Sequence, residues 1–304
     1  MGNYTVQFTA MGSHIQAWLN APSLQGSQIL KSLPQWFEIW EAKFSRFRPT
    51  SELCDLNRHA GEWMTVSAPL YEVITLAVQG AEATGGLFNP LILPALRAAG
   101  YDHSFEAGDF VPGPAALART NTTADFHEIG FRPADRSIRL PAHSEIDLGG
   151  IAKGWSAQQA AGILAALGPC LIDAGGDLVA VGSPDESGGW LVRIPDPRTS
   201  EIAHTVLLCD AAIATSGRDY RQWVRDGRAL HHIIDPRTRE PAASTVLSAS
   251  VIAPGADGAE AEIWAKTMML DPTRAHPFPA LLFHDDGSIA MDSEFEALCR
   301  DEMQ

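Results

Sequence analysis

The stretch that decides the fold is IDLGGIAKGWSAQQAAGILAALGPCLIDAGGDLVAVG, residues 146–182. Its first half predicts a helix that opens at a glycine pair and stops at Gly168 and Pro169, because glycine and proline both terminate helices. Its second half predicts a strand, a glycine turn at Gly175 and Gly176, and a second strand. Helix and strand signals in one stretch indicate an α+β protein.

The flanking sequence continues this pattern on both sides. Strands or helices are predicted over residues 4–20 (a strand pair or one long bent strand, with a possible break at residues 11–13), 33–47 (an amphipathic helix), 69–84 (a helix capped by Ser67), 190–195 and 205–216 (strands), 259–270 (a helix) and around 286 (a hairpin at DDGS). No repeat or low-complexity linker interrupts these elements. We therefore expect one α+β domain over residues 1–304.

The composition is that of a globular protein with an acidic surface. Hydrophobic residues make up 45% of the 304 residues and charged residues 19%, and the formal net charge is −15. A nucleic-acid binder needs a basic face to contact phosphates, so this class is not expected. An anionic cofactor would have to be held by local cations, backbone N–H groups or a metal ion.

The chain carries no signal for export or for a membrane span. The four cysteines are scattered with no CxxC pair, which predicts reduced thiols rather than disulfides or a zinc site. The N-terminus lacks a basic segment followed by an apolar run, and no apolar stretch reaches 18 residues. We expect a soluble cytoplasmic protein without a membrane span.

Three glycine-rich segments are candidate anion sites. GGIAKG, residues 149–154, is not a Walker loop, and no GxGxxG motif follows a strand. It does place Lys153 in the first turn of a helix, where backbone N–H groups and an ammonium attract anions. AGGD at 174–177 allows close backbone approach, and Asp177 can cap or bind a ligand hydroxyl. The alternative for all of these, including TSG at 215–217, is a plain packing turn.

A histidine pair precedes a polar turn near the C-terminal third. HHIIDPRTREP, residues 231–241, predicts a strand through His231 and His232 that ends at a turn. In a continuous strand the two histidines point to opposite faces, with His232 on the face of Ile234. The histidine pair, followed by Asp235, is a candidate metal-binding or acid–base group, and the alternative is structural or exposed histidines.

Eight segments in order resemble the ApbE family, the FAD:protein FMN transferases. They span most of the chain, which makes the resemblance far more specific than any one motif. The segments are TAMGSHI (9–15), FSRFRPTSELCDLNR (44–58), GLFNPLILPALRAAGY (86–101), IDLGGIAKGWSAQQAAGIL (146–164), IDAGGDLVAVG (172–182), IATSGRDYRQW (213–223), HHIIDPRTREP (231–241) and VIAPGADGAEAEIWAKTMMLDP (251–272).

The resemblance implies a T-fold-like α+β architecture of mixed sheets and packed helices, with a flavin cleft between two lobes. It implies cleavage of the FAD diphosphate and transfer of FMN to a Thr or Ser hydroxyl of an acceptor protein, with release of AMP. The residues assigned to the cofactor by this resemblance are Met11, Arg46, Asn57, Phe88, Asp147, Lys153, Gly175, Gly176, Asp177, Thr215, Ser216, Gly217 and His232.

The resemblance also implies catalytic and metal-binding roles. His232 matches a histidine that assists the incoming hydroxyl, and Lys153 adds positive potential near the diphosphate. Mg²⁺ would be held by the backbone carbonyl of Ala152 and by the residues at Glu262 and Lys266. A divalent ion would neutralise the diphosphate and stabilise the departing phosphate.

The chain departs from the family pattern at three places. Asn89 stands where Asp is usual, and Arg239 replaces a glycine, so we expect that turn not to need a glycine-only conformation. Glu262 and Lys266 stand where the family has its metal-binding Asp and Thr. These two are either an exposed ion pair one helical turn apart or an altered metal site in which the ammonium competes with, or partly replaces, the cation.

Three functions fit these observations. The first is a magnesium-dependent FMN transferase. The second is a catalytically weak FAD-binding protein, such as a flavin carrier or sensor, which the Glu262 and Lys266 departure favours. The third is an FAD diphosphatase that releases FMN and AMP to water.

Overall fold

The computed structural model describes residues 2–22, 24–105, 110–112 and 124–300. The chain divides into two compact units. Unit 1 comprises Met1–Glu38, Lys153–Asp219 and Ser244–Gln304, and unit 2 comprises Ile39–Ala152 and Tyr220–Ala243. The expectation of a single domain stays a prediction.

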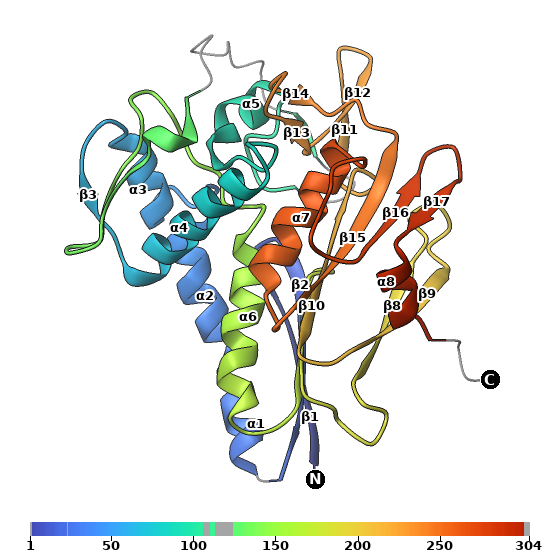
Figure 1. The fold of residues 1–304 in the computed structure, drawn as a ribbon. Coiled ribbons are helices and arrows are strands. Elements are labelled where there is room, and N and C mark those ends of the chain that lie inside the picture. The colour runs from blue at the N-terminus through green and yellow to red at the C-terminus, as the bar shows by residue number, and fades with distance from the viewer. Residues whose placement is uncertain (1, 23, 106–109, 113–123, 301–304) are drawn as a thin grey trace. The chain divides into compact units, whose positions relative to one another are not determined.

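Unit 1 is built on an eight-stranded sheet (Figure 1). Every strand pairing in this sheet, as described, is antiparallel. Of the two alternatives for residues 4–20, the structure shows the strand pair and not one long bent strand. Across the sheet the strands run β1 (Gly2–Ala10), β2 (Ser13–Ala21), β6 (Cys170–Ala174), β7 (Leu178–Val181), β10 (Ala211–Gly217), β15 (Val246–Pro254), β16 (Ala280–His284) and β17 (Ile289–Met291).

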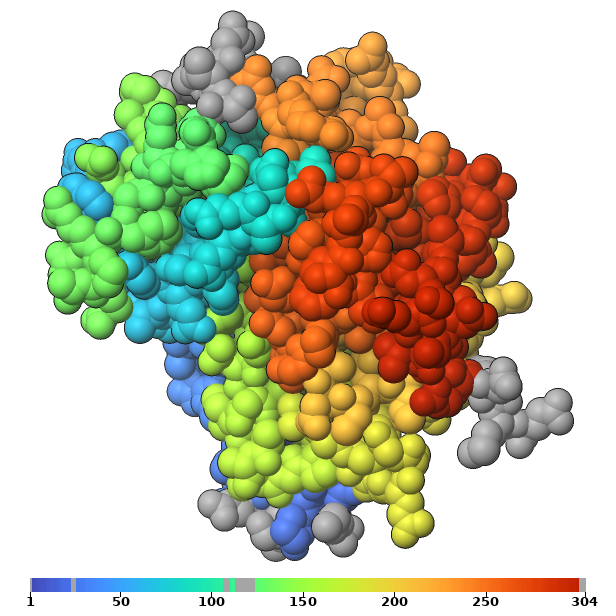
Figure 2. All heavy atoms as spheres, in the orientation of Figure 1, coloured from blue at the N-terminus to red at the C-terminus, as the bar shows by residue number. Residues whose placement is uncertain are grey.

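Two helices that matter for the site belong to unit 1. Helix α7 (Gly258–Leu270) packs on β10 and β15, where small residues such as Ala212 and Ala249 let the helix approach the sheet. Helix α6 (Ala152–Ala165) lies beside α7 (Figure 1). The C-terminal part of unit 1 forms a continuous orange-red surface (Figure 2), but α7 itself is almost wholly buried. Its partly exposed residues are Glu260, Lys266 and Leu270.

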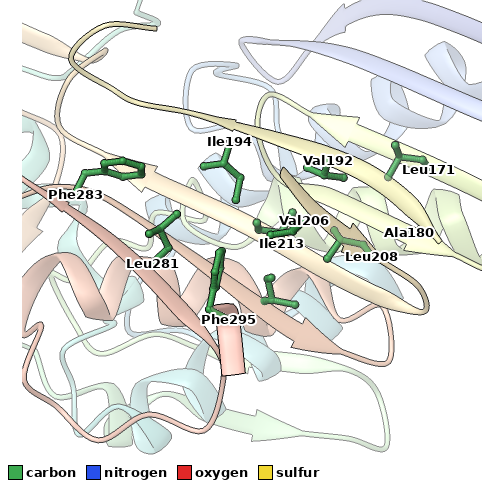
Figure 3. Close-up of a cluster of buried hydrophobic side chains, with 11 residues drawn as sticks. Leu171, Ala180, Val192, Ile194, Val206, Leu208, Ile213, Leu281, Phe283 and Phe295 are labelled. Carbon is green, nitrogen blue, oxygen red and sulfur yellow. The ribbon is translucent and has the colours of Figure 1, made fainter. Parts of the chain in front are cut away.

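The main core of unit 1 lies against the opposite face of the sheet. There β8 (Trp190–Pro195), β9 (Ile202–Leu208) and α8 (Ser293–Leu298) cover the sheet, and Phe283 and Phe295 are completely buried (Figure 3). Because side chains alternate along a strand, Ile213 faces this core while its neighbours on β10 face α7. Helix α1 (Leu24–Leu30) contacts β1 and β2, and α2 (Leu33–Phe44) follows it.

Unit 2 is mostly helical with short strands. Its elements are α3 (Glu52–Arg58), β3 (Met64–Thr65), α4 (Ala68–Ala83), η1 (Pro90–Ile92), α5 (Leu93–Ala98), η2 (Phe126–Glu128), β4 (Gly130–Arg132), β5 (Ser137–Arg139), β11 (Gln222–Arg225), β12 (Arg228–His231), β13 (Ile234–Asp235) and β14 (Glu240–Pro241). An aromatic cluster around Tyr101 and Trp223 forms part of its core.

The predicted α+β class is confirmed, and one cap differs from its expected form. Ser67 stands at the N-cap of α4, but its side chain does not cap the helix. Its hydroxyl instead donates to Oε2 of Glu52, at 2.6 Å. The hairpin predicted at DDGS is confirmed as β16 and β17. Within the part of the chain that the structure describes, no helix combines the length and apolar composition needed to cross a bilayer.

Candidate active site

Helices α6 and α7 meet at their N-terminal ends through two glycines. Gly154 and Gly258 face each other at a distance that leaves no room for a side chain on either. This close approach lets the backbone N–H of Gly154 donate to Oε2 of Glu262, at 3.0 Å. The first turn of α6 is therefore tied to a carboxylate of α7, an arrangement that the helix dipole favours.

Lys153 joins two buried carboxylates. Its ammonium donates to Oε1 of Glu262 at 3.0 Å and makes a close ion pair with Oδ2 of Asp177. The side chains of Asp177 and Glu262 are only 3% and 1% exposed, and that of Lys153 is 14% exposed. Buried charges are costly unless paired, so these three groups depend on one another.

Lys266 completes the group on the next turn of α7. Its ammonium lies 4.0 Å from Oε1 of Glu262, and its side chain is 20% exposed. The expectation that Glu262 and Lys266 form an exposed ion pair is wrong, because the carboxylate is buried between two helices. We call Lys153, Asp177, Glu262 and Lys266 the ion cluster. It contains two acids and two bases, so its formal charges cancel.

Burial dominates the electrostatics of the cluster. Desolvation raises the pKa of Asp177 to about 6, although the ammonium of Lys153 acts in the opposite direction. Glu262 also raises it, because two like charges lie near each other. A buried carboxyl group whose pKa is raised beside a specific charged partner, as at Asp177, is frequent at functional sites.

The glycine turn between β6 and β7 holds Asp177 in place. Gly175 and Gly176 have φ angles of +71° and +93°, which favour glycine. A β-carbon on Gly175 would also collide with Ser13, whereas Gly176 faces open space. Met11, at φ +52° in the turn between β1 and β2, is two residues from Ser13. The glycines at 175 and 176 thus meet the geometric needs of a tight turn.

The TSG segment lies at the end of β10. The hydroxyl of Thr215 is 2.8 Å from that of Ser250 on β15, while Ser216 is buried. As neighbours on one strand, Thr215 and Ser216 point to opposite faces of the sheet, so only one can serve a ligand on a given face. Gly217 ends the strand.

In unit 2, Asp147 is fixed from three directions. Its carboxylate accepts from the backbone N–H of Gly149 at 2.9 Å and pairs with Nε of Arg46 at 2.8 Å. Its own N–H donates to the carbonyl of Pro90. The side-chain amide of Asn57 bonds both the N–H and the carbonyl of Ile146, at 2.8 and 3.0 Å. Asn57 therefore positions the residue next to Asp147.

Arg46 connects this carboxylate to the aromatic cluster. Its guanidinium lies 4.0 Å from the ring centre of Phe47 and 4.4 Å from that of Tyr101, and it also donates to the carbonyl of Tyr101. The ring of Tyr101 packs edge-on against that of His232, with centroids 6.4 Å apart. In unit 2, Tyr101 therefore contacts both Arg46 and His232.

His231 belongs to a strand and His232 does not, which the predicted continuous strand did not anticipate. The expected continuous strand is wrong, because β12 ends at His231 and β13 begins only at Ile234. His231 is 8% exposed, and its ring contacts the carbonyl of Ala242 and the N–H of Ile233 at 3.2 and 3.3 Å. His231 is therefore a structural residue, and His232 lies in the break between the strands.

Phe88 and Asn89, in the segment where the chain has Asn in place of the family's Asp, stabilise the fold. Phe88 is buried at 5% exposure, and Asn89 accepts from the N–H of Leu91 and so caps η1. Arg239 has a φ of +62°. The turn does not need a glycine-only conformation, as expected, because Arg239 itself adopts the left-handed backbone that glycine favours.

The donor chemistry around Glu262 does not fit a divalent cation. Both carboxylate oxygens already face an N–H group or an ammonium, and a protonated Lys266 has no lone pair with which to ligate. Ala152 is the first residue of α6 and the last of unit 2. Among the described residues, no three His, Cys, Asp or Glu side chains are grouped as metal ligands.

The sequence was compared with known protein families and with curated relatives. A family model described as ApbE family matches residues 6–278. The chain belongs to the ApbE family. A relative from Treponema pallidum (strain Nichols), named FAD:protein FMN transferase, is 31% identical over 268 residues, which cover 81% of this chain and 73% of that protein. A relative of the same name from Vibrio cholerae serotype O1 is 26% identical, covering 77% and 72%.

Solved structures of ApbE proteins have the same fold. The ApbE protein of Thermotoga maritima superposes with a TM-score of 0.88 at 25% identity, covering 99% of this chain and all of that one. The flavin transferase ApbE of Vibrio cholerae gives 0.77 at 21% identity, covering 98% and 100%. The second likeness is one of fold alone.

Sequence reasoning missed several residues around these sites. Ser13 packs on the glycine turn and Ser250 pairs with Thr215, but single serines in strands carry no sequence signal. Tyr101 lies within one of the segments that resemble the family. Tyr101 directly follows Gly100, whose φ is +100°. A glycine before an aromatic residue is therefore the sequence signal for a turn that could have identified Tyr101.

Proposed function

We propose that this chain is an FAD:protein FMN transferase. The observation that carries the proposal is its similarity, over 81% of its length, to an ApbE relative with that name. The ion cluster supports it, since charged groups buried at the motif positions have no role in hydrophobic packing. Charged groups held at the reaction site can stabilise the charge that develops when a diphosphate is cleaved.

In the proposed reaction, a Thr or Ser hydroxyl of an acceptor protein attacks the phosphorus on the FMN side of the FAD diphosphate. A new phosphoester bond forms, the bridging P–O bond breaks, and its electron pair leaves with AMP. The hydroxyl proton passes to a base, for which His232 is the candidate in unit 2. A base of this kind contributes about 10²–10⁴-fold to a rate.

The family resemblance also implies Mg²⁺ as a cofactor. The groups around Glu262 do not fit a divalent ion, so the proposed reaction contains no metal-dependent step. The remaining cofactor assignments, among them Met11, Gly176, Asp177 and Ser216, are proposed on motif position. The scattered free cysteines support a cytoplasmic location, where thiols stay reduced.

The second candidate is an FAD-binding protein with little turnover. It is favoured by Lys266, which pairs with Glu262 where the resemblance expects a metal ligand. An FAD diphosphatase is the third candidate, and it would use water in place of the acceptor hydroxyl.

One experiment separates the three candidates. Purified protein is incubated with FAD and candidate acceptor proteins, with and without Mg²⁺, and AMP is followed by chromatography and covalent flavin by in-gel fluorescence. AMP together with fluorescent acceptor supports the transferase. AMP with free FMN indicates the diphosphatase, and flavin binding without AMP indicates the carrier.

Ligand preference tests the diphosphate assignment independently of turnover. We expect FAD to bind more tightly than FMN or riboflavin in a flavin-fluorescence titration. Lys153→Ala should weaken FAD more than riboflavin, because the lysine belongs to the charged cluster. Equal affinities for FAD and riboflavin would remove the diphosphate from the proposed site.

A further inference from the structure

Glu262 is surrounded by cations that belong to the chain. Its Oε1 atom faces the ammonium of Lys153 at 3.0 Å and that of Lys266 at 4.0 Å, and its Oε2 atom accepts from Gly154. The carboxylate is 1% exposed. A hydrated metal ion would have to displace at least one of these groups.

We propose that the ammonium of Lys266 takes the place of the divalent metal in this chain. It balances Glu262 while no ligand is bound and turns to the diphosphate of FAD when the cofactor binds. This inference rests on the proposed function for the identity of the ligand. It concerns an exchange of ion-pair partners, so no covalent bond changes.

Charge supports an internal cation. The ion cluster is formally neutral as it stands, so a divalent ion would bring an excess of two positive charges into a mostly buried place. Such an excess is expensive at low dielectric. Loss of one ammonium, by contrast, would leave one net negative charge beside Asp177 and Glu262, which is what attracts a hard cation.

Geometry identifies Lys266 as the exchangeable partner. Lys153 contacts both carboxylates and is 14% exposed. Lys266 is more exposed, at 20%, and its ammonium lies farther from Glu262, at 4.0 Å against 3.0 Å for Lys153. Lys266 is also one of the few residues of α7 that reach solvent. If Lys266 moves to the diphosphate, Glu262 keeps Lys153 and Gly154 as partners.

The test measures metal binding directly. Mn²⁺ is titrated into the wild-type protein and into Lys266→Thr, and free Mn²⁺ is read by electron paramagnetic resonance, first without FAD and then with it. We expect weak wild-type binding and an affinity at least about tenfold higher in Lys266→Thr, because a hydroxyl replaces a repelling charge. Lys266→Arg, which keeps the charge, should behave like the wild type.

A surface-lysine control, a second variant at position 266 and the metal dependence of FAD affinity complete the test. Lys43→Thr, at a surface lysine paired with Glu52, is the control for a general charge effect and should leave Mn²⁺ binding unchanged. If Lys266→Thr does not fold, as judged by circular dichroism, Lys266→Met tests the same loss of charge and should also bind Mn²⁺ more tightly. FAD affinity of the folded variant should become metal-dependent, while that of the wild type should be the same in EDTA and in Mg²⁺.

Tight, saturable Mn²⁺ binding to the wild type, unchanged or weakened in Lys266→Thr, would overturn the inference. So would wild-type FAD affinity that collapses in EDTA. Both readouts are independent of flavin transfer. A failure to form AMP or flavinylated acceptor would count against the proposed function and would leave the metal titration to decide this inference.

Discussion

Gly154 and Gly258 lie so close together that neither position has room for a β-carbon, since a methyl group on either would overlap the carbonyl oxygen of the other. The contact brings the first turns of α6 and α7 together. It thereby sets the distance at which Glu262 accepts from the N–H of Gly154 and pairs with Lys153. Helix packing and the charged site are therefore one structural unit.

Gly154→Ala should destabilise the protein by about 3 kcal/mol, because the added methyl meets backbone atoms that cannot move separately. Urea denaturation measures the loss. Gly162→Ala is the matched control on the same helix, since its β-carbon meets nothing within 4 Å. It should stabilise by about 0.5–1 kcal/mol, as alanine does in a helix. Equal effects at the two positions would contradict the contact.

Glu262→Gln should cost about 3 kcal/mol of folding free energy, because it leaves the ammonium of Lys153 with one carboxylate in a buried place. Thermal and urea unfolding of the purified variant measure this. Glu260→Gln, two residues earlier and partly exposed, should change stability by less than about 0.5 kcal/mol. If both variants were equally stable, the cluster would not contribute to folding.

Arg239→Gly should raise stability by about 0.5–1 kcal/mol, because a left-handed backbone costs a non-glycine residue about 1–2 kcal/mol, part of which is offset in the unfolded chain. Arg239→Ala removes the same side chain but keeps the strain at φ +62°. The comparison of the two variants by thermal unfolding isolates the backbone effect. A glycine variant no more stable than the alanine variant would refute it.

The stability of the wild type should fall as pH rises from about 4 to 6, relative to Asp177→Asn. The pKa of Asp177 is raised to about 6 by burial. In this window the folded chain holds a proton that the unfolded chain has released, so a rise in pH favours unfolding. Denaturation at several pH values measures the difference, and a flat or rising difference would contradict it.

Asp196 provides a control of opposite sign. Its pKa is lowered to about 2, chiefly by a hydrogen bond from Arg198. The folded state then favours the ionised form, so this contribution is present above the ordinary pKa and is lost as pH falls toward 2. The difference between wild type and Asp196→Asn should therefore rise with pH, in a lower window than that of Asp177.

The two histidines should separate stability from turnover. His231→Ala should lower the free energy of unfolding by about 1–2 kcal/mol, because its buried ring bonds the backbone at Ile233 and Ala242. His232→Ala should instead slow AMP formation and leave FAD affinity within about threefold, as expected for a group acting in the transition state. Reversed effects would place the catalytic role on His231.

Local signals in the sequence predicted most of the fold. The turn at Met11 and Gly12, the glycine turn after β6 and the bounds of α7 all follow from residue types within a few positions. The ion cluster did not, because Lys153 contacts partners 24 and 109 residues away in sequence. Periodicity placed Glu262 and Lys266 on neighbouring turns, but it could not show that α7 is buried nearly all round.

Backbone conformation at a substituted position was also beyond the sequence. Arg239 in place of the family's glycine indicated that the turn needs no glycine-only conformation, but it could not show that Arg239 itself adopts a left-handed backbone at φ +62°. The break between β12 and β13 was also not predicted, because no residue type in HHII indicates where the strand pairing stops.

Internal neutralisation of the ion cluster has a kinetic consequence. Because its four charges cancel, the whole formal charge of −15 acts on an approaching ligand from the rest of the chain. An anion such as FAD is therefore repelled at long range, and under the proposed role of Lys266 it is attracted only when it comes near that ammonium. Dissolved salt screens the repulsion over about 8 Å at physiological ionic strength. Moderate salt should therefore accelerate the association of FAD, the reverse of what is seen when opposite charges steer an encounter.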